Sequence, residues 1–225
     1  FFIYMSIVFF LNLLLFLPYT LSNISLRLNT TNVIVVKDTI DEDVASKFIY
    51  QLNSLQDKTN LYVYLDTPGG SVDSGNKILM EIQKYNMSCI ADRAYSMGFV
   101  LLQGCKTRYI LQYGKIMQHQ ISYAVQGEKG KIDSYNDFIS QIEDELVTMQ
   151  ADKIGIDKNE FRLKTMNEWW SFGKYAKELK MVDDIIDVYC DDKLTKKNYT
   201  VSFGPFHAVY SKCPLIPTPI DTYIK

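Results

Sequence analysis

The sequence predicts an α/β fold in which helices cover a mostly parallel sheet. Between residues 33 and 188, short apolar or β-branched runs alternate with segments of helical length and helical apolar spacing. Strands separated by helices pair in parallel, because a parallel pair needs a crossover of a dozen or more residues. The 225 residues suffice for one such domain with a full core and leave little for a second.

Three strand–helix units open the predicted domain. Residues 33–36 form a β-branched run, and a helix over residues 41–55 follows, with an aspartate at its start that can cap it. Residues 61–65 form the second strand, which a Pro-Gly-Gly turn separates from another amphipathic helix. Residues 88–91 form the third strand, which leads to a helix at residues 99–103.

The second half of the domain continues this alternation and contains one much longer helix. Two short strands are expected at residues 108–110 and 115–117, and a short helix at residues 173–179 precedes a last strand at residues 181–188. The long helix spans residues 133–154 and carries an apolar stripe that needs a packing partner. This stripe consists of Phe138, Ile142, Leu146 and Met149.

Residues 189–225 change character and are expected to form a C-terminal appendage. Strands at residues 199–203 and 207–210 can pair as a hairpin around a Gly-Pro turn, and a proline-rich end follows. A disulfide between Cys190 and Cys213 would attach this hairpin to the core in an oxidising compartment, and two unpaired thiols are the equal alternative.

An apolar segment precedes the domain and indicates targeting. Residues 1–17 are almost wholly apolar, so we expect residues 1–22 to be a signal peptide or a membrane anchor. No Lys or Arg precedes the run and the first residue is not Met, so a truncated or artefactual start is the alternative. Four glycosylation sequons favour a location in the secretory lumen or at a membrane over a cytoplasmic or organellar one. Their asparagines are Asn23, Asn29, Asn86 and Asn198.

Charge and motif content exclude several classes of function. The chain has 24 Lys and Arg against 26 Asp and Glu, and a net charge of −2 gives no global field that would attract nucleic acid. The four cysteines and two histidines show no spacing typical of a zinc site, so no metal ligand is assigned. There is no phosphate-binding GxxxxGK[ST] segment, and we expect no cofactor.

The segment around Ser96 has the features of a catalytic nucleophile. A predicted strand ends there, the chain turns, and a helix begins at once. A helix N-terminus offers free N–H groups and a favourable dipole to a developing negative charge, so the Met97 N–H is a natural oxyanion donor. Gly69 and Gly70 give a second place where bare backbone can approach a substrate carbonyl group.

A serine nucleophile requires a base, and only His119 and His207 can supply one. His119 follows an apolar strand, which places it at the edge where α/β folds build their sites. His207 lies in the predicted appendage, and we assign it a structural role. Taken alone, either residue is weak evidence for catalysis.

Three segments in order make the pattern specific. Residues 66–72 (DTPGGSV), 94–98 (AYSMG) and 117–120 (MQHQ) together resemble the signature segments of ClpP-type serine peptidases, the proteolytic subunits of Clp protease. The resemblance runs from about residue 33 to residue 188 and leaves out the leader and the tail. It implies the ClpP/crotonase fold of repeated βαβ units, with residues 133–154 as a protruding handle helix.

The resemblance also implies roles for individual residues. Ser96 becomes the nucleophile, His119 the general base, and the N–H groups of Gly70 and Met97 the oxyanion hole. The family's triad aspartate falls on Glu168, a longer side chain with one more rotatable bond. An exposed carboxylate without a catalytic role is the alternative at Glu168. The residues implied to hold an extended substrate chain are Gly69, Ser71, Val72 and Gln120.

ClpP-like subunits are homo-oligomers that form stacked rings, act on polypeptides and receive them from an AAA+ unfoldase. The resemblance therefore implies a serine endopeptidase with these partners, although a working leader would separate it from cytosolic unfoldases. A catalytically inactive ring subunit is the main alternative. A thioester hydrolase of the crotonase type and a lysine-dependent signal-peptide peptidase fit less well, because Ser96 and His119 both stand in ClpP-like segments.

Overall fold

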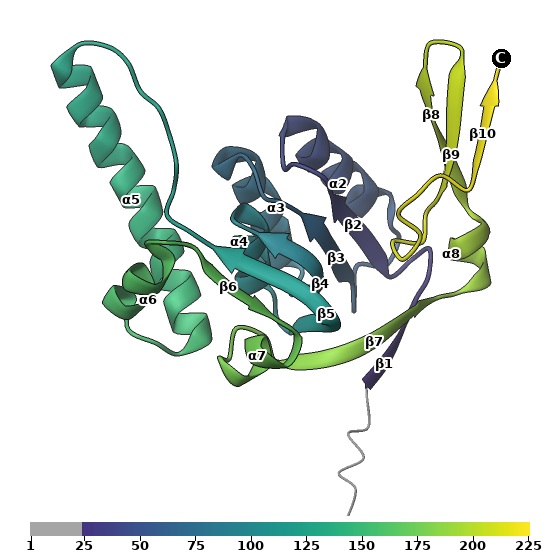
Figure 1. Ribbon diagram of the computed structural model, residues 1–225, viewed down its shortest axis with the longest axis horizontal. Coiled ribbons are helices and arrows are strands. Elements are labelled where there is room, and N and C mark those ends of the chain that lie inside the picture. Colours follow the sequence, from purple (N-terminus) through teal and green to yellow (C-terminus); the bar gives the residue numbers. More distant parts are fainter. Residues whose placement is uncertain (1–23) are drawn as a thin grey trace, which may run out of the picture.

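The computed structural model describes residues 24–225, and one seven-stranded sheet organises this part of the chain (Figure 1). In sequence order the strands are β1 (Ile24–Leu28), β2 (Val33–Lys37), β3 (Tyr62–Thr67), β4 (Ser88–Tyr95), β5 (Arg108–Gln118), β6 (Trp169–Phe172) and β7 (Asp184–Cys190). Their spatial order is β1-β7-β5-β4-β3-β2, and β6 adds to β5. All pairs are parallel except β5 with β6, so the predicted α/β class is confirmed.

Three helices cover one face of the sheet and enclose the main core. They are α2 (Glu42–Ser54), α3 (Val72–Lys84) and α4 (Met97–Gly104), as the alternation of strands and helices predicts. Asp41 caps α2 by accepting a hydrogen bond from the Val44 N–H at 2.9 Å. Ser71 caps α3 in the same way through the Ser74 N–H at 3.2 Å. Fixed helix starts matter here because α3 and α4 both begin where strands end beside the site.

Strand β5 is a single long strand where two short ones are predicted. Its first part pairs with β7 and its last four residues pair with β6. Gly114 lies between these parts, and a Cβ there would approach the Ala91 carbonyl oxygen to 2.4 Å. The change of neighbours along one strand explains why its sequence divides into two apolar runs.

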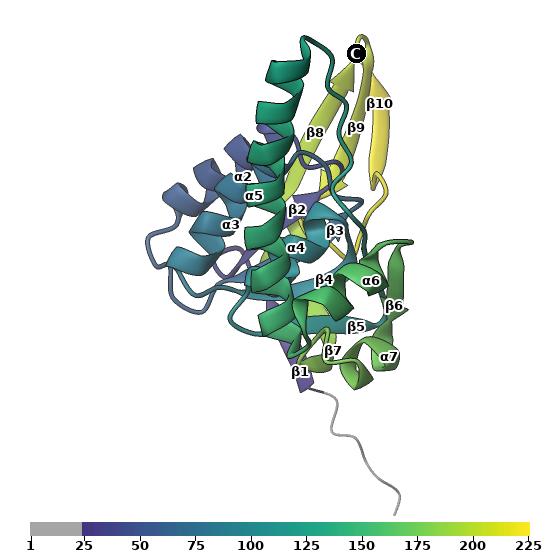
Figure 2. The ribbon, with the colours of Figure 1, turned by 90° about the vertical axis from the view of Figure 1, so that its left-hand side faces the viewer.

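The long helix is α5 (Lys129–Ile154), and it protrudes from the body of the protein (Figure 1; Figure 2). Only its C-terminal part is buried, where Leu146, Val147 and Ala151 join the core. Phe138, from the predicted apolar stripe, is 52 % exposed. A short helix that the sequence analysis missed, α6 (Lys158–Thr165), follows and is capped by Asp157.

The C-terminal part forms more than the predicted hairpin. After α7 (Gly173–Glu178) and β7, the chain forms α8 (Asp192–Lys196) and a separate antiparallel sheet of β8 (Asn198–Phe203), β9 (Phe206–Ser211) and β10 (Asp221–Ile224). A disulfide joins Cys190 to Cys213. Cys213 and Leu194 pack against Leu28 and Tyr64, so this segment covers part of the second face of the main sheet.

Two predictions concern the N-terminal part of the chain. The predicted signal peptide or anchor at residues 1–22 lies outside the described residues. The domain was expected from residue 33, but β1 already pairs with β7 in the main sheet. Among the helices of residues 24–225, none combines the length and apolar character needed to cross a membrane.

Candidate active site

Ser96 occupies a sharp turn between β4 and α4. Its backbone has φ 52° and ψ −119°, in the left-handed half of the map that non-glycine residues rarely enter. The Ser96 N–H donates a 2.8 Å hydrogen bond to the Met117 carbonyl oxygen of β5, which fixes the turn against the neighbouring strand. A strained serine held by its surroundings is the arrangement found at nucleophile turns between a strand and a helix.

The bare backbone of Gly69 makes room for this turn. Gly69 has φ 94°, and a Cβ there would lie 2.7 Å from the Ser96 Cβ and 2.6 Å from the Tyr95 carbonyl oxygen. Its segment is fixed to the chain before α2, because the Ile40 N–H donates to the Gly69 carbonyl oxygen at 2.8 Å. Any larger residue at position 69 would push Ser96 out of place.

Two backbone N–H groups near Ser96 have no partner in the part of the chain described. The Met97 N–H is at the first position of α4, and the Gly70 N–H belongs to a residue whose own φ is 149°. Both residues line the cavity next to Ser96. Free N–H groups of this kind can donate hydrogen bonds to a developing oxyanion without first breaking other hydrogen bonds.

His119 lies directly after β5 and contacts Ser96. The distance between His119 Nε2 and Ser96 Oγ is 2.8 Å, which is a hydrogen bond. The ring is partly buried, and the His119 backbone N–H donates to the side-chain Oε1 of Gln118 at 3.1 Å. The structure thus joins the predicted nucleophile and the predicted base, which are 23 residues apart in sequence.

Glu168 is not joined to His119, so the predicted triad is incomplete in this structure. The last residue pair of the β5–β6 ladder is Gln118 with Trp169, so the next residues along, His119 and Glu168, are neighbours across the two strands. However, Glu168 has φ 65°, is exposed, and accepts a hydrogen bond from Trp170 Nε1 at 2.9 Å. No hydrogen bond or ion pair between Glu168 and His119 occurs within residues 24–225.

A cavity of about 710 Å³ opens beside Ser96 and His119. Helices α5 and α6 form much of its wall, and α6 was absent from the predicted elements. The apolar residues that line it include Val72, Val100, Leu146, Val147, Phe161 and Leu163. Gln118 and Gln150 are polar members of the wall that sequence analysis also missed.

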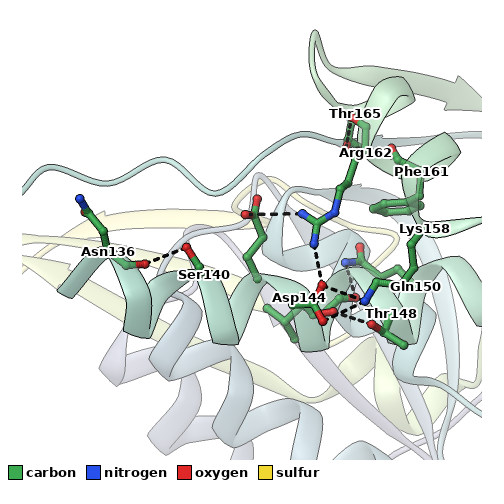
Figure 3. Close-up of polar contacts among 11 residues, drawn as sticks. Asn136, Ser140, Asp144, Thr148, Gln150, Lys158, Phe161, Arg162 and Thr165 are labelled. Atoms are coloured by element: carbon green, nitrogen blue, oxygen red, sulfur yellow. Dashed lines mark hydrogen bonds and ion pairs between the residues drawn. The ribbon is translucent and has the colours of Figure 1, made fainter. Parts of the chain in front are cut away.

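Ion pairs fix α6 to α5 at the wall of this cavity. Arg162 lies within 2.8 Å of an Asp144 carboxylate oxygen and 3.7 Å of a Glu143 oxygen. Lys158 also contacts Asp144 at 2.8 Å, and Figure 3 shows both cations converging on this carboxylate. These hydrogen bonds lower the pKa of Asp144, with the Lys158 bond as the largest contribution. The shape of the cavity therefore depends on both helices.

The predicted substrate-contacting residues divide into two groups. Val72 and Gln120 line the cavity beside Ser96 and His119. Gly69 is buried beneath Ser96, and Ser71 uses its side chain to cap α3. Between residues 24 and 225 there is no group of three or more His, Cys, Asp or Glu side chains arranged to hold a metal ion.

Comparison with known proteins shows which family this sequence resembles. The Clp protease family model matches residues 19–189. One similar curated protein is the ATP-dependent Clp protease proteolytic subunit 2 of Corynebacterium efficiens. It is 31 % identical over 169 residues, which cover 71 % of this chain and 84 % of that protein.

Proposed function

This chain belongs to the Clp protease family, and on that premise we propose that it is a serine endopeptidase in which Ser96 is the nucleophile and His119 the base. The observation that carries the proposal is the 2.8 Å contact between His119 Nε2 and Ser96 Oγ at the N-terminus of α4. Hydrogen-bond contact between a serine and a histidine is the geometry that activates a hydroxyl for attack.

In the proposed mechanism, His119 Nε2 takes the Ser96 proton while Oγ attacks the peptide carbonyl carbon. The carbonyl oxygen becomes an oxyanion that the Gly70 and Met97 N–H groups bind. His119 then gives its proton to the leaving amine, and an acyl–Ser96 ester remains. Water, deprotonated by His119, attacks this ester and releases the acid product, which regenerates the free serine.

The cavity beside Ser96 supports a preference for apolar side chains in the substrate. Val100 of α4 and Leu146 and Val147 of α5 give this wall an aliphatic part, and Val72 and Phe161 add to it. An extended chain would lie between the segment that begins at Gly70 and the segment that begins at Gln120. Main-chain pairing with these segments would bind unfolded polypeptides with little regard to sequence.

Assembly and location are part of the same proposal. Members of the family form oligomeric rings and work with AAA+ unfoldases, and the protruding α5 supports a ring-forming role for this chain. The two disulfides, Cys89–Cys105 and Cys190–Cys213, together with the sequons, support a location in an oxidising, secretory compartment or at its membrane. In such a compartment the protein would act on peptides or on chains that are already unfolded.

The test is active-site labelling with a fluorophosphonate probe, which reacts with activated serines. We expect the assembled wild-type protein to be labelled, and Ser96→Ala and His119→Ala to lose labelling by at least about a hundredfold. The chain offers a matched control, because Ser202 Oγ and His207 Nδ1 are also 2.8 Å apart. Ser202→Ala and His207→Ala should leave labelling unchanged.

An unlabelled wild-type protein would contradict the proposal and favour the inactive ring subunit. Glu168 gives that alternative its support, because its carboxylate contacts Trp170 and not His119. The rings can be checked in the same samples by measuring their mass, so loss of assembly is not mistaken for loss of chemistry.

A further inference from the structure

Two buried glutamines lie between helix α5 and His119. Gln118, the last residue of β5, is 5 % exposed, and Gln150 of α5 is 2 % exposed. Burying an amide is unfavourable unless its polar atoms find partners. An apolar pair of similar size would fill the same space, so these two amides call for a specific explanation.

The two side chains form a continuous series of hydrogen bonds. Gln150 Nε2 donates to the Leu146 carbonyl oxygen one turn earlier in α5, at 2.8 Å. Gln118 Nε2 donates to Gln150 Oε1, and Gln118 Oε1 accepts the hydrogen bond from the His119 N–H at 3.1 Å. Each amide uses both its donor and its acceptor, and the series ends on the backbone of His119.

This series matters because His119 is beyond the end of the sheet. The registers of β5 with β4 and β6 end at Met117 and Gln118, so among the strands of residues 24–225 none pairs with the residue that follows. The Gln118 side chain accepts the His119 N–H in place of a neighbouring strand. Misplacing a catalytic group by about 1 Å can slow a reaction about a hundredfold, so this backbone contact bears on the chemistry.

We propose that Gln118 and Gln150 are positioning residues that hold His119 against Ser96 and connect it to helix α5. The inference rests on the proposed function of His119 as the base. Neither glutamine needs to touch the reacting atoms. Gln118 acts by accepting the His119 N–H, and Gln150 acts by fixing the Gln118 amide so that its oxygen, and not its nitrogen, faces His119.

The two residues should differ in their effect on the reaction. Gln118→Leu removes the acceptor for the His119 N–H, and we expect labelling of Ser96 to slow about thirtyfold. Gln150→Leu leaves that acceptor in place but releases the Gln118 amide, so labelling should slow only about threefold. Each single variant also leaves one buried amide atom of the other glutamine unpaired and should lower the unfolding midpoint by several degrees.

The double variant Gln118→Leu with Gln150→Leu separates positioning from packing. Removing both partners of a buried hydrogen bond is far less destabilising than removing one, so its unfolding midpoint should recover. Labelling should stay about thirtyfold slower, because the His119 N–H still lacks its acceptor. Gln103→Leu is the matched control: Gln103 is equally buried and bonded to the Met181 carbonyl oxygen and to Arg108, away from His119.

Histidine NMR gives a second readout that does not depend on activity. The chain has two histidines, so a His207→Ala background leaves the His119 ring as the only histidine signal. Gln118→Leu should shift or broaden that signal, and Gln103→Leu should not. Labelling that recovers together with stability in the double variant, or a His119 signal that Gln118→Leu leaves unchanged, would overturn the positioning role. A wild-type protein that resists labelling would instead count against the proposed function.

Discussion

Residues 24–225 contain two serine–histidine pairs with the same contact distance and different surroundings. Ser96 Oγ and His119 Nε2 are 2.8 Å apart, and so are Ser202 Oγ and His207 Nδ1. The first pair lies at a helix N-terminus, beside free N–H groups and a cavity. The second lies on an exposed hairpin, with the His207 ring stacked on Tyr223 at 4.8 Å. The hydrogen bond is common to both, so the surroundings distinguish a candidate active site.

The backbone makes the same distinction. Ser96 has a left-handed φ that its neighbours impose, whereas Ser202 lies within regular strand β8. The neighbours include Gly69, which leaves room for the turn, and Met117, which accepts the Ser96 N–H. A serine in a regular strand presents its hydroxyl without nearby oxyanion donors, because the strand's N–H groups are used in pairing. We therefore expect changes in this backbone to have the largest effect.

Gly69→Ala should break the first pair outright. The added Cβ meets Ser96 and Tyr95 at under 3 Å and must also adopt a left-handed φ, so we expect labelling to fall by at least about a hundredfold. Crowding and strain should together lower the free energy of unfolding by on the order of 3 kcal/mol. Labelling rates and chemical denaturation measure the two effects.

Gly155→Ala is the matched control for that variant. Gly155 ends α5 with φ 81°, and a Cβ there meets nothing within 4 Å. In Gly155→Ala, the left-handed backbone alone should therefore lower the free energy of unfolding, by about 1 kcal/mol, and labelling should stay at the wild-type rate. Equal labelling rates for Gly69→Ala and the wild-type protein would mean that the turn at Ser96 does not determine the reactivity of its hydroxyl.

Asp183→Asn should lower stability and leave the Ser96–His119 pair intact. Asp183 forms an ion pair with Arg108, whose side chain is 5 % exposed, at the junction of β5 and β7. Burial raises the Asp183 pKa, but the hydrogen bonds from Arg108 outweigh it and the pKa falls below its usual value. Breaking this ion pair at neutral pH should lower the free energy of unfolding by about 2 kcal/mol. The loss is smaller than for a fully buried pair because Asp183 is partly exposed.

The pH dependence follows from the direction of that shift. A carboxyl group with a lowered folded-state pKa contributes its full stability above its unfolded pKa of about 3.9 and loses it as pH falls through the folded value. The difference in free energy of unfolding between wild type and Asp183→Asn should thus be constant from pH 7 to about pH 5 and shrink below about pH 4. A stability gap between wild type and Asp183→Asn that widens in acid would contradict this prediction.

Much of the fold and half of the site were predictable from local signals. Ser96, His119 and the glycines at 69 and 70 stand at strand ends that apolar runs and turn residues mark clearly. Asp41 marked the start of α2 by the same logic. These features depend on residues close in sequence, and sequence reasoning detects such patterns well.

The remainder depends on contacts between distant segments. Strand β6 has only four residues and forms by pairing with the end of β5. Its own sequence is too short to show the alternation of apolar and polar residues that predicts a strand. Gln118 and Gln150 are 32 residues apart, and nothing local shows that two amides will meet in the interior. The capping Asp157 was a local signal for α6 that could have been used.

The smallest expected effects concern Glu168, which neighbours His119 across β5 and β6 but whose carboxylate is bonded to Trp170. Trp170 Nε1 holds this carboxylate, so Trp170→Phe should free it to turn toward His119 and raise labelling by about two- to fivefold. Glu168→Gln should slow labelling by about tenfold, since a neutral amide stabilises the imidazolium less. The double variant, Trp170→Phe with Glu168→Gln, should be labelled at the same rate as Glu168→Gln, because the carboxylate that Trp170→Phe would release is then absent. If neither single variant changes the labelling rate, Glu168 is not the orienting acid, and the Ser96–His119 pair works without one.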